Sequence, residues 1–163
     1  MIGPSDFELK VMRLALRGEE SWRQTLRMQL PHLLVARRDV YACGVTTHFT
    51  SSGVVDTVVI PRGEDGLPVR SYPPTVNAIR ELPTPGLASF VLWIGRDGVI
   101  VELEAFSLVD DTWPEQSEMG FHSFQDDEGC LVEEAQDGVL VRGSSSGAAA
   151  AMRRHSVDRE DLR

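Results

Sequence analysis

Two apolar segments joined by an Asp-Gly turn place the strongest constraint on how this chain can fold. Residues 88–94 and 99–106 are rich in β-branched, aromatic and other apolar side chains, and Arg96-Asp97-Gly98 stands between them. Asp and Gly tolerate the positive φ angles of tight hairpin turns, so the pattern predicts two antiparallel strands. Glu102 and Glu104 alternate with apolar residues, which predicts that both point to a solvent-exposed face of the sheet.

Two amphipathic segments at the start of the chain predict helices over residues 6–17 and 22–29. Ser5 and Glu8 have the spacing of a capping box, in which each side chain accepts a hydrogen bond from the backbone N–H of the other residue. The same logic predicts that Ser21 starts the second helix. Two arginines are expected on the side of the second helix that faces away from the core, Arg23 and Arg27.

From Pro31 onward the chain changes to β-branched and aromatic residues separated by turn signals, which indicates strands. The segments 61–75 and 110–128 are expected to be long loops. Helices followed by strands are typical of the α+β class, so we expect two N-terminal helices packed on an antiparallel sheet of about six to eight strands. Besides the hairpin, the expected strands are residues 33–43, 45–50, 54–60, 76–82, 130–135 and 139–142.

The length and composition of the chain indicate one domain followed by a tail. A chain of 163 residues has the usual size of one domain and can bury about two-thirds of its unfolded surface. We expect residues 1–142 to form the α+β domain, and residues 143–163 to form a Gly/Ser/Ala-rich hinge and a loose charged tail. The sequence has no run of about 20 apolar residues and no secretory signal pattern, so we expect a cytoplasmic protein without membrane contact.

The negative charge of the chain is concentrated in its second half. Residues 81–142 carry fourteen acidic and two basic side chains, and the whole chain has a net charge of −9. This excess disfavours nucleic acid, because phosphate contacts require Lys and Arg, and it favours a basic protein partner. Net charge also maintains solubility, an alternative that the sequence leaves open. The candidate contact residues are Asp110, Asp111, Trp113, Glu115, Glu118, Asp126, Asp127 and Glu128.

No arrangement of residues in the sequence indicates a metal or cofactor site. The four histidines have none of the short spacings that zinc sites use, and the two cysteines are 87 positions apart. No glycine-rich phosphate loop is present, and the acidic pairs do not follow the spacing of a calcium loop. We therefore expect no cofactor and no metal.

Two weaker patterns keep an enzymatic alternative open. Cys43 and His48, with Asp39 upstream, have the residue types of an activated thiol nucleophile, but positions 43 and 48 face opposite sides of a continuous strand. Glu102 and Glu104 have the residue types of a glycosidase pair, although such pairs are common on solvated strand faces.

Several apolar and turn motifs are shared with a group of small bacterial proteins. They are residues 26–30, Arg38-Asp39 followed by Gly44, Thr47 and Phe49, the run from 90–94 through Asp97-Gly98 to 103–106, and Trp113-Pro114. On these motifs, residues 10–115 resemble a group of small uncharacterised bacterial α+β proteins with no assigned activity. The resemblance implies a helical start with a sheet behind it, and it brings no activity, cofactor or partner.

These observations predict a protein-binding role. We expect a small cytoplasmic acidic module of the immunity type, which neutralises a basic toxin or effector through its acidic half. Two alternatives stay open. One is a small enzyme that uses a thiol or paired carboxylates, and the other is a structural subunit of a larger assembly, including a homo-oligomer.

Overall fold

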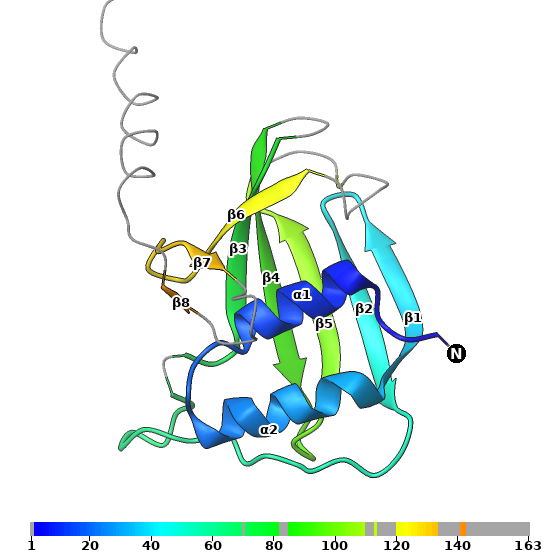
Figure 1. Cartoon of the computed structure of the whole chain (residues 1–163), viewed down its shortest axis with the longest axis vertical. Coiled ribbons are helices and arrows are strands. Elements are labelled where there is room, and N and C mark those ends of the chain that lie inside the picture. The colour runs from blue at the N-terminus through cyan, green and yellow to red at the C-terminus, as the bar shows by residue number, and fades with distance from the viewer. Residues whose placement is uncertain are drawn as a thin grey trace, which may run out of the picture.

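The computed structural model describes residues 2–69, 71–81, 85–109, 113, 120–133 and 141–142. Within them, helices α1 (Asp6–Ala15) and α2 (Ser21–Gln29) pack on one face of a six-stranded antiparallel sheet (Figure 1). The α+β class, the two N-terminal helices and the antiparallel sheet are therefore confirmed. The expected tail, residues 143–163, lies outside the described residues.

The six strands follow the order β1-β2-β5-β4-β3-β6, and every neighbouring pair is antiparallel. The pairing of β2 with β5 brings together strands that are far apart in the sequence. A separate short pair, β7 (Val132–Glu133) and β8 (Val141–Arg142), follows β6 in the chain. The strands of the main sheet are β1 (Leu33–Tyr41), β2 (Gly44–Ser51), β3 (Thr75–Arg80), β4 (Gly86–Ile94), β5 (Ile100–Ser107) and β6 (Phe121–Gln125).

Most of the predicted strands are present. The hairpin expected at residues 88–94 and 99–106 is confirmed as β4 and β5, and Gly98 in its turn has a φ angle of +77°. The strands expected at 33–43, 45–50 and 76–82 correspond to β1, β2 and β3. Of the strands expected at 130–135 and 139–142, only the short antiparallel pair β7 and β8 is present, and the turn expected between them lies outside the described residues.

Residues 54–60 form no strand of the sheet, so that prediction is wrong. The segment runs past α2 and the turn between β4 and β5. There the Gln29 side chain donates to the Asp56 carbonyl at 2.6 Å, and the Val58 amide donates to the Gly98 carbonyl at 3.1 Å. A β-branched run fits a strand only where a neighbouring strand is in reach, and here a side chain and a turn take that place.

The strand β6 lies in the segment that was expected to be an acidic loop, residues 110–128, so that expectation is wrong for its last part. β6 pairs with β3 at the edge of the sheet. Its first residue, Phe121, stacks on Phe7 and on Trp113 with ring centroids 5.6 and 5.5 Å apart. Aromatic packing against α1 therefore fixes a strand whose polar sequence resembles a loop.

The capping box at the start of α1 is confirmed. The Glu8 amide donates to the Ser5 hydroxyl at 3.2 Å, and the Ser5 amide donates to the Glu8 carboxylate at 2.7 Å. These bonds satisfy N–H groups that have no partner within the helix. The side of α1 that faces the sheet is fully buried and carries Val11, Met12 and Leu14.

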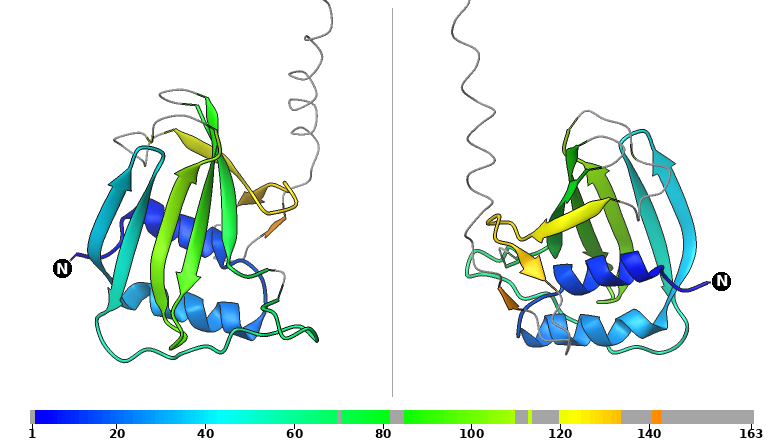
Figure 2. Two further views of the ribbon diagram at one scale, coloured as in Figure 1. Left: turned by 180° about the vertical axis from the view of Figure 1, so that it is seen from behind. Right: turned by 45° about the horizontal axis from the view of Figure 1, so that its top comes forward.

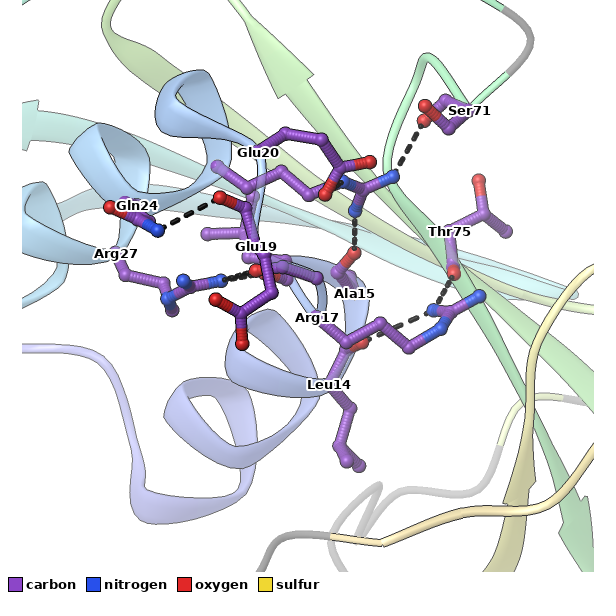
Figure 3. A network of polar contacts seen from close by, with 12 residues as sticks. Leu14, Ala15, Arg17, Glu19, Glu20, Gln24, Arg27, Ser71 and Thr75 are labelled. Carbon is purple, nitrogen blue, oxygen red and sulfur yellow. Dashed lines mark hydrogen bonds and ion pairs between the residues drawn. The ribbon is translucent and has the colours of Figure 1, made fainter. Parts of the chain in front are cut away.

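Three arginines hold the C-terminal end of α1, where backbone carbonyls lack partners within the helix (Figure 3). Their positive charges also complement the negative end of the helix dipole. The bonds run from Arg17 to the carbonyls of Leu14 (3.1 Å) and Thr75 (2.9 Å), from Arg23 to those of Ala15 (2.7 Å) and Ser71 (3.3 Å), and from Arg27 to those of Leu16 and Gly18 (2.9 Å for Gly18).

The prediction that Arg23 faces the solvent is wrong. Its side chain is only 6% exposed and packs on the ring of Trp22. Burial lowers the pKa of Arg23, and the nearby carboxylate of Glu20 offsets part of this effect. The guanidinium is tolerated inside because carbonyl oxygens of α1 and of the segment before β3 accept from its terminal N–H groups.

The apolar core fills the space between the helices and the sheet, and the sheet contributes Val76, Phe90 and Leu92 to it. Because both helices lie on the same side, no described element covers the opposite side of β1, β2, β5 and β4 (Figure 2, left). We call the covered side the inner face and the other side the outer face.

Candidate functional site

A cavity of about 310 Å³ lies between the start of α1 and the inner face of the sheet. Its apolar lining includes Phe7, Phe90, Leu103 and Trp113. One end is polar. There Glu8, Arg38 and Thr47 line the cavity. Small-molecule pockets are typically mostly apolar cavities of about 300–1,000 Å³ with a few polar groups, so this cavity lies at the small end of that range.

A bulge in β1 brings Arg38 to the polar end of the cavity. Leu33 and Val35 point to the inner face. Because side chains alternate along a regular strand, residue 37 would also point to the inner face and residue 38 to the outer face. The register shifts between Val35 and Arg37, and Arg38 consequently lies opposite Thr47 on the inner face.

Four hydrogen bonds satisfy the Glu8 carboxylate. Burial raises the pKa of Glu8, but the bonds from Arg38, the Ser5 amide and Thr47 outweigh burial and hold this pKa below its usual value. Glu8 is therefore a fixed anion, with its acceptor sites in use. The donors to Oε1 are Arg38 Nε (3.2 Å) and the Thr47 hydroxyl (2.7 Å), and those to Oε2 are Arg38 Nη2 (2.8 Å) and the Ser5 amide (2.7 Å).

Trp113 lines the apolar part of the cavity. Its ring stacks on Phe121 and meets Phe90 edge to face, with centroids 5.5 and 6.2 Å apart. The side chain is 7% exposed, and its backbone amide donates to the Ala42 carbonyl at 2.8 Å. The indole Nε1–H is buried and has no hydrogen-bond partner among the described residues.

A second polar cluster lies on the outer face, where His48 stands between two carboxylates. His48 Nε2 is 2.9 Å from Asp39 Oδ2, and Nδ1 is 3.0 Å from Glu102 Oε1. Arg37 Nε lies 3.1 Å from the same Asp39 oxygen. The hydrogen bond from His48, together with Arg37, holds the pKa of Asp39 below its usual value.

Trp93 lies beside this cluster on β4 and is 37% exposed. It pairs across strands with Glu102, and its indole Nε1 donates to Glu104 Oε2 at 3.0 Å. The prediction that Glu102 and Glu104 share a solvent-facing side of β5 is confirmed, since their paired residues on β2 are His48 and Thr46. An indole ring and two carboxylates therefore lie together on the outer face.

The acidic loop residues do not all lie at the surface. Trp113 is part of the core, and Asp126 is 6% exposed because its Oδ1 accepts from the amides of Glu128 and Cys130. Asp127 and Glu128 are exposed. Asp110, Asp111, Glu115 and Glu118 lie outside the described residues.

The described acidic residues also do not gather on one side of the molecule. Glu102 and Glu104 lie on the outer face, whereas Asp127 lies near enough to Arg23 of α2 to affect its pKa, on the helix side. The negative charge that the sequence concentrates in residues 81–142 therefore does not form a single patch among the described residues.

The thiol pattern finds no support from His48. Cys43 is exposed in the turn between β1 and β2, and both ring nitrogens of His48 already contact the carboxylates of Asp39 and Glu102. Within the described ranges, no three His, Cys, Asp or Glu side chains have an arrangement that could hold a metal ion.

The sequence interpretation missed both clusters. The capping box identified Glu8 but not Arg38, because the inward position of Arg38 depends on a bulge that has no local signal. The sequence interpretation considered His48 and Asp39 together only for thiol chemistry. The alternation of Glu102 and Glu104 with apolar residues on β5 was the feature that indicated an outer face with acidic side chains.

Comparisons of the chain with protein-family models, with curated proteins and with solved structures give no match. The resemblance of residues 10–115 to a bacterial group stays a prediction. No helix in the described part of the chain is long and apolar enough to span a bilayer.

Proposed function

We propose that this protein binds a basic protein partner through the outer face of its sheet. The observation that carries the proposal is the position of Glu102 and Glu104 beside the partly exposed ring of Trp93, on a face that no described element covers. Asp39 extends this group on β1, through the His48 ring that it shares with Glu102. Within the described part of the chain, the Arg37 guanidinium contacts Asp39, and the His48 ring contacts both Asp39 and Glu102. The electrostatic field of such a face attracts cationic partners and steers their approach.

The geometry suits an arginine side chain of the partner. A guanidinium over the Trp93 ring gains a cation–π interaction, and the neighbouring carboxylates of Glu102 and Glu104 accept its N–H groups. Hydrogen bonds among the described residues occupy Oε2 of Glu104 and Oε1 of Glu102, which leaves the other oxygen of each carboxylate for the partner. Aromatic and Arg residues are also the most frequent energetic centres of interfaces.

In its specific form, the proposal is an immunity-type protein of the cytoplasm that neutralises a basic toxin or effector. Its support is the small size of the chain, its net charge of −9 and the position of the anionic residues on an open sheet face. Neutralisation requires tight binding and no chemistry, so a rigid sheet face with fixed charges is sufficient for it.

The test is a binding comparison between two charge-reversal variants. Glu102→Lys/Glu104→Lys reverses the outer face, and Glu19→Lys/Glu64→Lys makes the same change in net charge at exposed sites elsewhere. Immobilised wild-type protein and the control variant are expected to retain the same cationic partner at about 50 mM salt. At this concentration the Debye length is about three times that at about 500 mM, so charges are screened less. The outer-face variant is expected to lose this partner, and wild-type binding should weaken strongly at the higher salt concentration.

Thermal melts of all variants establish that each is folded. A partner that the outer-face variant retains as well as the wild type, or the absence of any salt-sensitive partner, would contradict the proposal. A partner lost equally by both variants would assign binding to net charge alone and would also contradict it.

A further inference from the structure

His48 on β2 lies between carboxylates on the two adjacent strands of the outer face. Its ring is partly buried, with Nε2 2.9 Å from Asp39 Oδ2 on β1 and Nδ1 3.0 Å from Glu102 Oε1 on β5. Arg37 of β1 also contacts the ring, and its Nη2 atom lies 3.3 Å from Nε2. Within the described part of the chain, these three residues are the charged groups that face His48 from the neighbouring strands.

The two carboxylate contacts identify the protonation state of the ring. An ionised carboxylate only accepts hydrogen bonds, and a neutral imidazole has one N–H donor, so two such contacts require the doubly protonated imidazolium. Asp39 is ionised, because the hydrogen bond from His48, together with the Arg37 charge, holds its pKa below the usual value. A neutral ring would turn the lone pair of one nitrogen toward a carboxylate oxygen at 2.9 or 3.0 Å, which is repulsive.

The same surroundings also provide hydrogen bonds for a neutral ring. If the proton leaves Nε2, the Nδ1–H group still donates to Glu102, and Nε2 becomes an acceptor for the Nη2–H group of Arg37. Asp39 then loses the hydrogen bond from His48 and keeps the one from Arg37 Nε at 3.1 Å. The ring therefore has two hydrogen-bonded states that differ by one charge. Histidine is the side chain whose charge ordinarily changes between about pH 5 and 8.

We propose that His48 makes the binding of a cationic partner at the outer face depend on pH, an inference that rests on the proposed function. With the ring protonated, the positive charges of His48 and Arg37 balance the carboxylates of Asp39 and Glu102. A partner guanidinium over Trp93 and against Glu102 then meets a cation that is bound to the same carboxylate. Loss of the Nε2 proton ends this repulsion and gives the outer face one more negative charge. Binding is therefore weaker at acid than at alkaline pH, and a bound cation in turn favours the neutral ring.

The first test reads the protonation of the ring directly and needs no partner. The ring nitrogens of the ¹⁵N-labelled full chain are followed by NMR from about pH 5 to 9, and His48→Gln identifies the His48 signals by their absence. We expect both nitrogens to carry a proton at the acid end, and Nε2 alone to lose its proton as the pH rises. A ring that is neutral at the acid end, keeps both protons throughout or loses the Nδ1 proton instead would overturn the proposal.

The second test measures binding of N-acetylated hexaarginine, a probe whose guanidinium charges stay constant over this range. Isothermal titration calorimetry at about 50 mM salt keeps the screening weak. We expect the wild type to bind the probe about fivefold more tightly at about pH 8 than at about pH 6, since one charge close to the site changes. His48→Gln places a neutral amide at the same position and is expected to bind alike at both pH values.

His32→Gln is the matched control, because His32 is exposed in η1 (Leu30–His32) and is not part of this cluster. It should keep the pH dependence of the wild type, and amide spectra establish that each variant is folded. Equal pH dependence of the wild type and His48→Gln would overturn the inference. If Glu102→Lys/Glu104→Lys binds the probe like the wild type, the proposed function fails as well. If this double variant loses binding while wild-type binding is independent of pH, the inference alone fails.

Discussion

Glu8 joins three parts of the molecule through one buried carboxylate. It caps α1 through the Ser5 amide, reaches β1 through Arg38, and reaches β2 through Thr47. A buried charge that loses its partners costs several kcal/mol, which explains why every acceptor site of this side chain is used. The same bonds that stabilise the anion fix the entry angle of α1 over the sheet.

The ionisation of Glu8 makes stability depend on pH. The pKa of Glu8 in the folded protein lies below its usual value of 4.5, so the unfolded chain takes up the proton first as pH falls. The stabilisation is fully present above about pH 5 and is lost as pH falls below 4.5 through the folded-state pKa. We expect Glu8→Gln to lower the free energy of unfolding by about 2 kcal/mol at pH 7, a figure reduced for the partial exposure of Arg38.

Urea denaturation at pH values from about 3 to 7 checks this expectation. The difference between wild type and Glu8→Gln should shrink towards acid pH, where both side chains are uncharged. Asp6→Asn, an exposed position in the same helical turn, serves as the control and should change stability by no more than about 0.5 kcal/mol. A Glu8→Gln difference that stays constant across this range would contradict the assignment.

The helices and strands that were predicted correctly are those whose conformation depends on residues close together in the sequence. The capping box of α1 and the hairpin of β4 and β5 depend on residues within one turn of each other, and both are confirmed. β6 and the loop at residues 54–60 were predicted wrongly, because their conformations depend on distant partners: β3 and the aromatic ring of Phe7 for β6, and Gln29 for the loop.

The candidate sites show the same limit. The inward position of Arg38 follows from a bulge, and a single inserted residue exchanges the faces of all residues after it. Trp113 was assigned to a surface loop because its neighbours are acidic, yet its ring lies in the core. The outward position of Glu102 and Glu104 was predictable because β5 alternates regularly.

Gly98 allows the loop before β3 to lie against the turn between β4 and β5. An added Cβ would be 2.1 Å from the Val58 carbonyl oxygen, and the φ angle of +77° is already unfavourable for other residues. We expect Gly98→Ala to cost about 3 kcal/mol or more in unfolding free energy. Gly129 has the same φ angle with no atom within 4 Å of such a Cβ, so Gly129→Ala should cost only about 1 kcal/mol.

Urea denaturation of both variants separates backbone strain from the close approach to Val58. Equal costs for Gly98→Ala and Gly129→Ala would show that Val58 has no influence, contrary to the geometry.

For the molecule as a whole, the placement of both helices on one side gives the sheet two different faces. The inner face holds the core and the cavity, and the outer face carries the partly exposed carboxylates of Asp39 and Glu102. The central strands β5 and β4 have a hydrogen-bonded neighbour on each side, whereas β7 pairs with β8 alone among the described strands.

Native-state hydrogen exchange is expected to follow this arrangement. Amides of β4 and β5 should exchange most slowly, because they open only when the sheet does, and amides of β7 should exchange fastest among the strands. Exchange measured by NMR or mass spectrometry checks this order. Protection of β7 equal to that of β5 would show that the short pair belongs to the same cooperative unit, contrary to our expectation.

The pairing of β2 with β5 has a consequence for biosynthesis. β2 begins at Gly44, and its neighbour β5 begins only at Ile100. At a translation rate of about 5–20 residues per second, the first hairpin leaves the ribosome roughly 3–11 seconds before its partner strand does. During this interval the nascent chain exposes the side of Phe49 that the finished protein buries, so folding of the core has to wait until β5 has emerged.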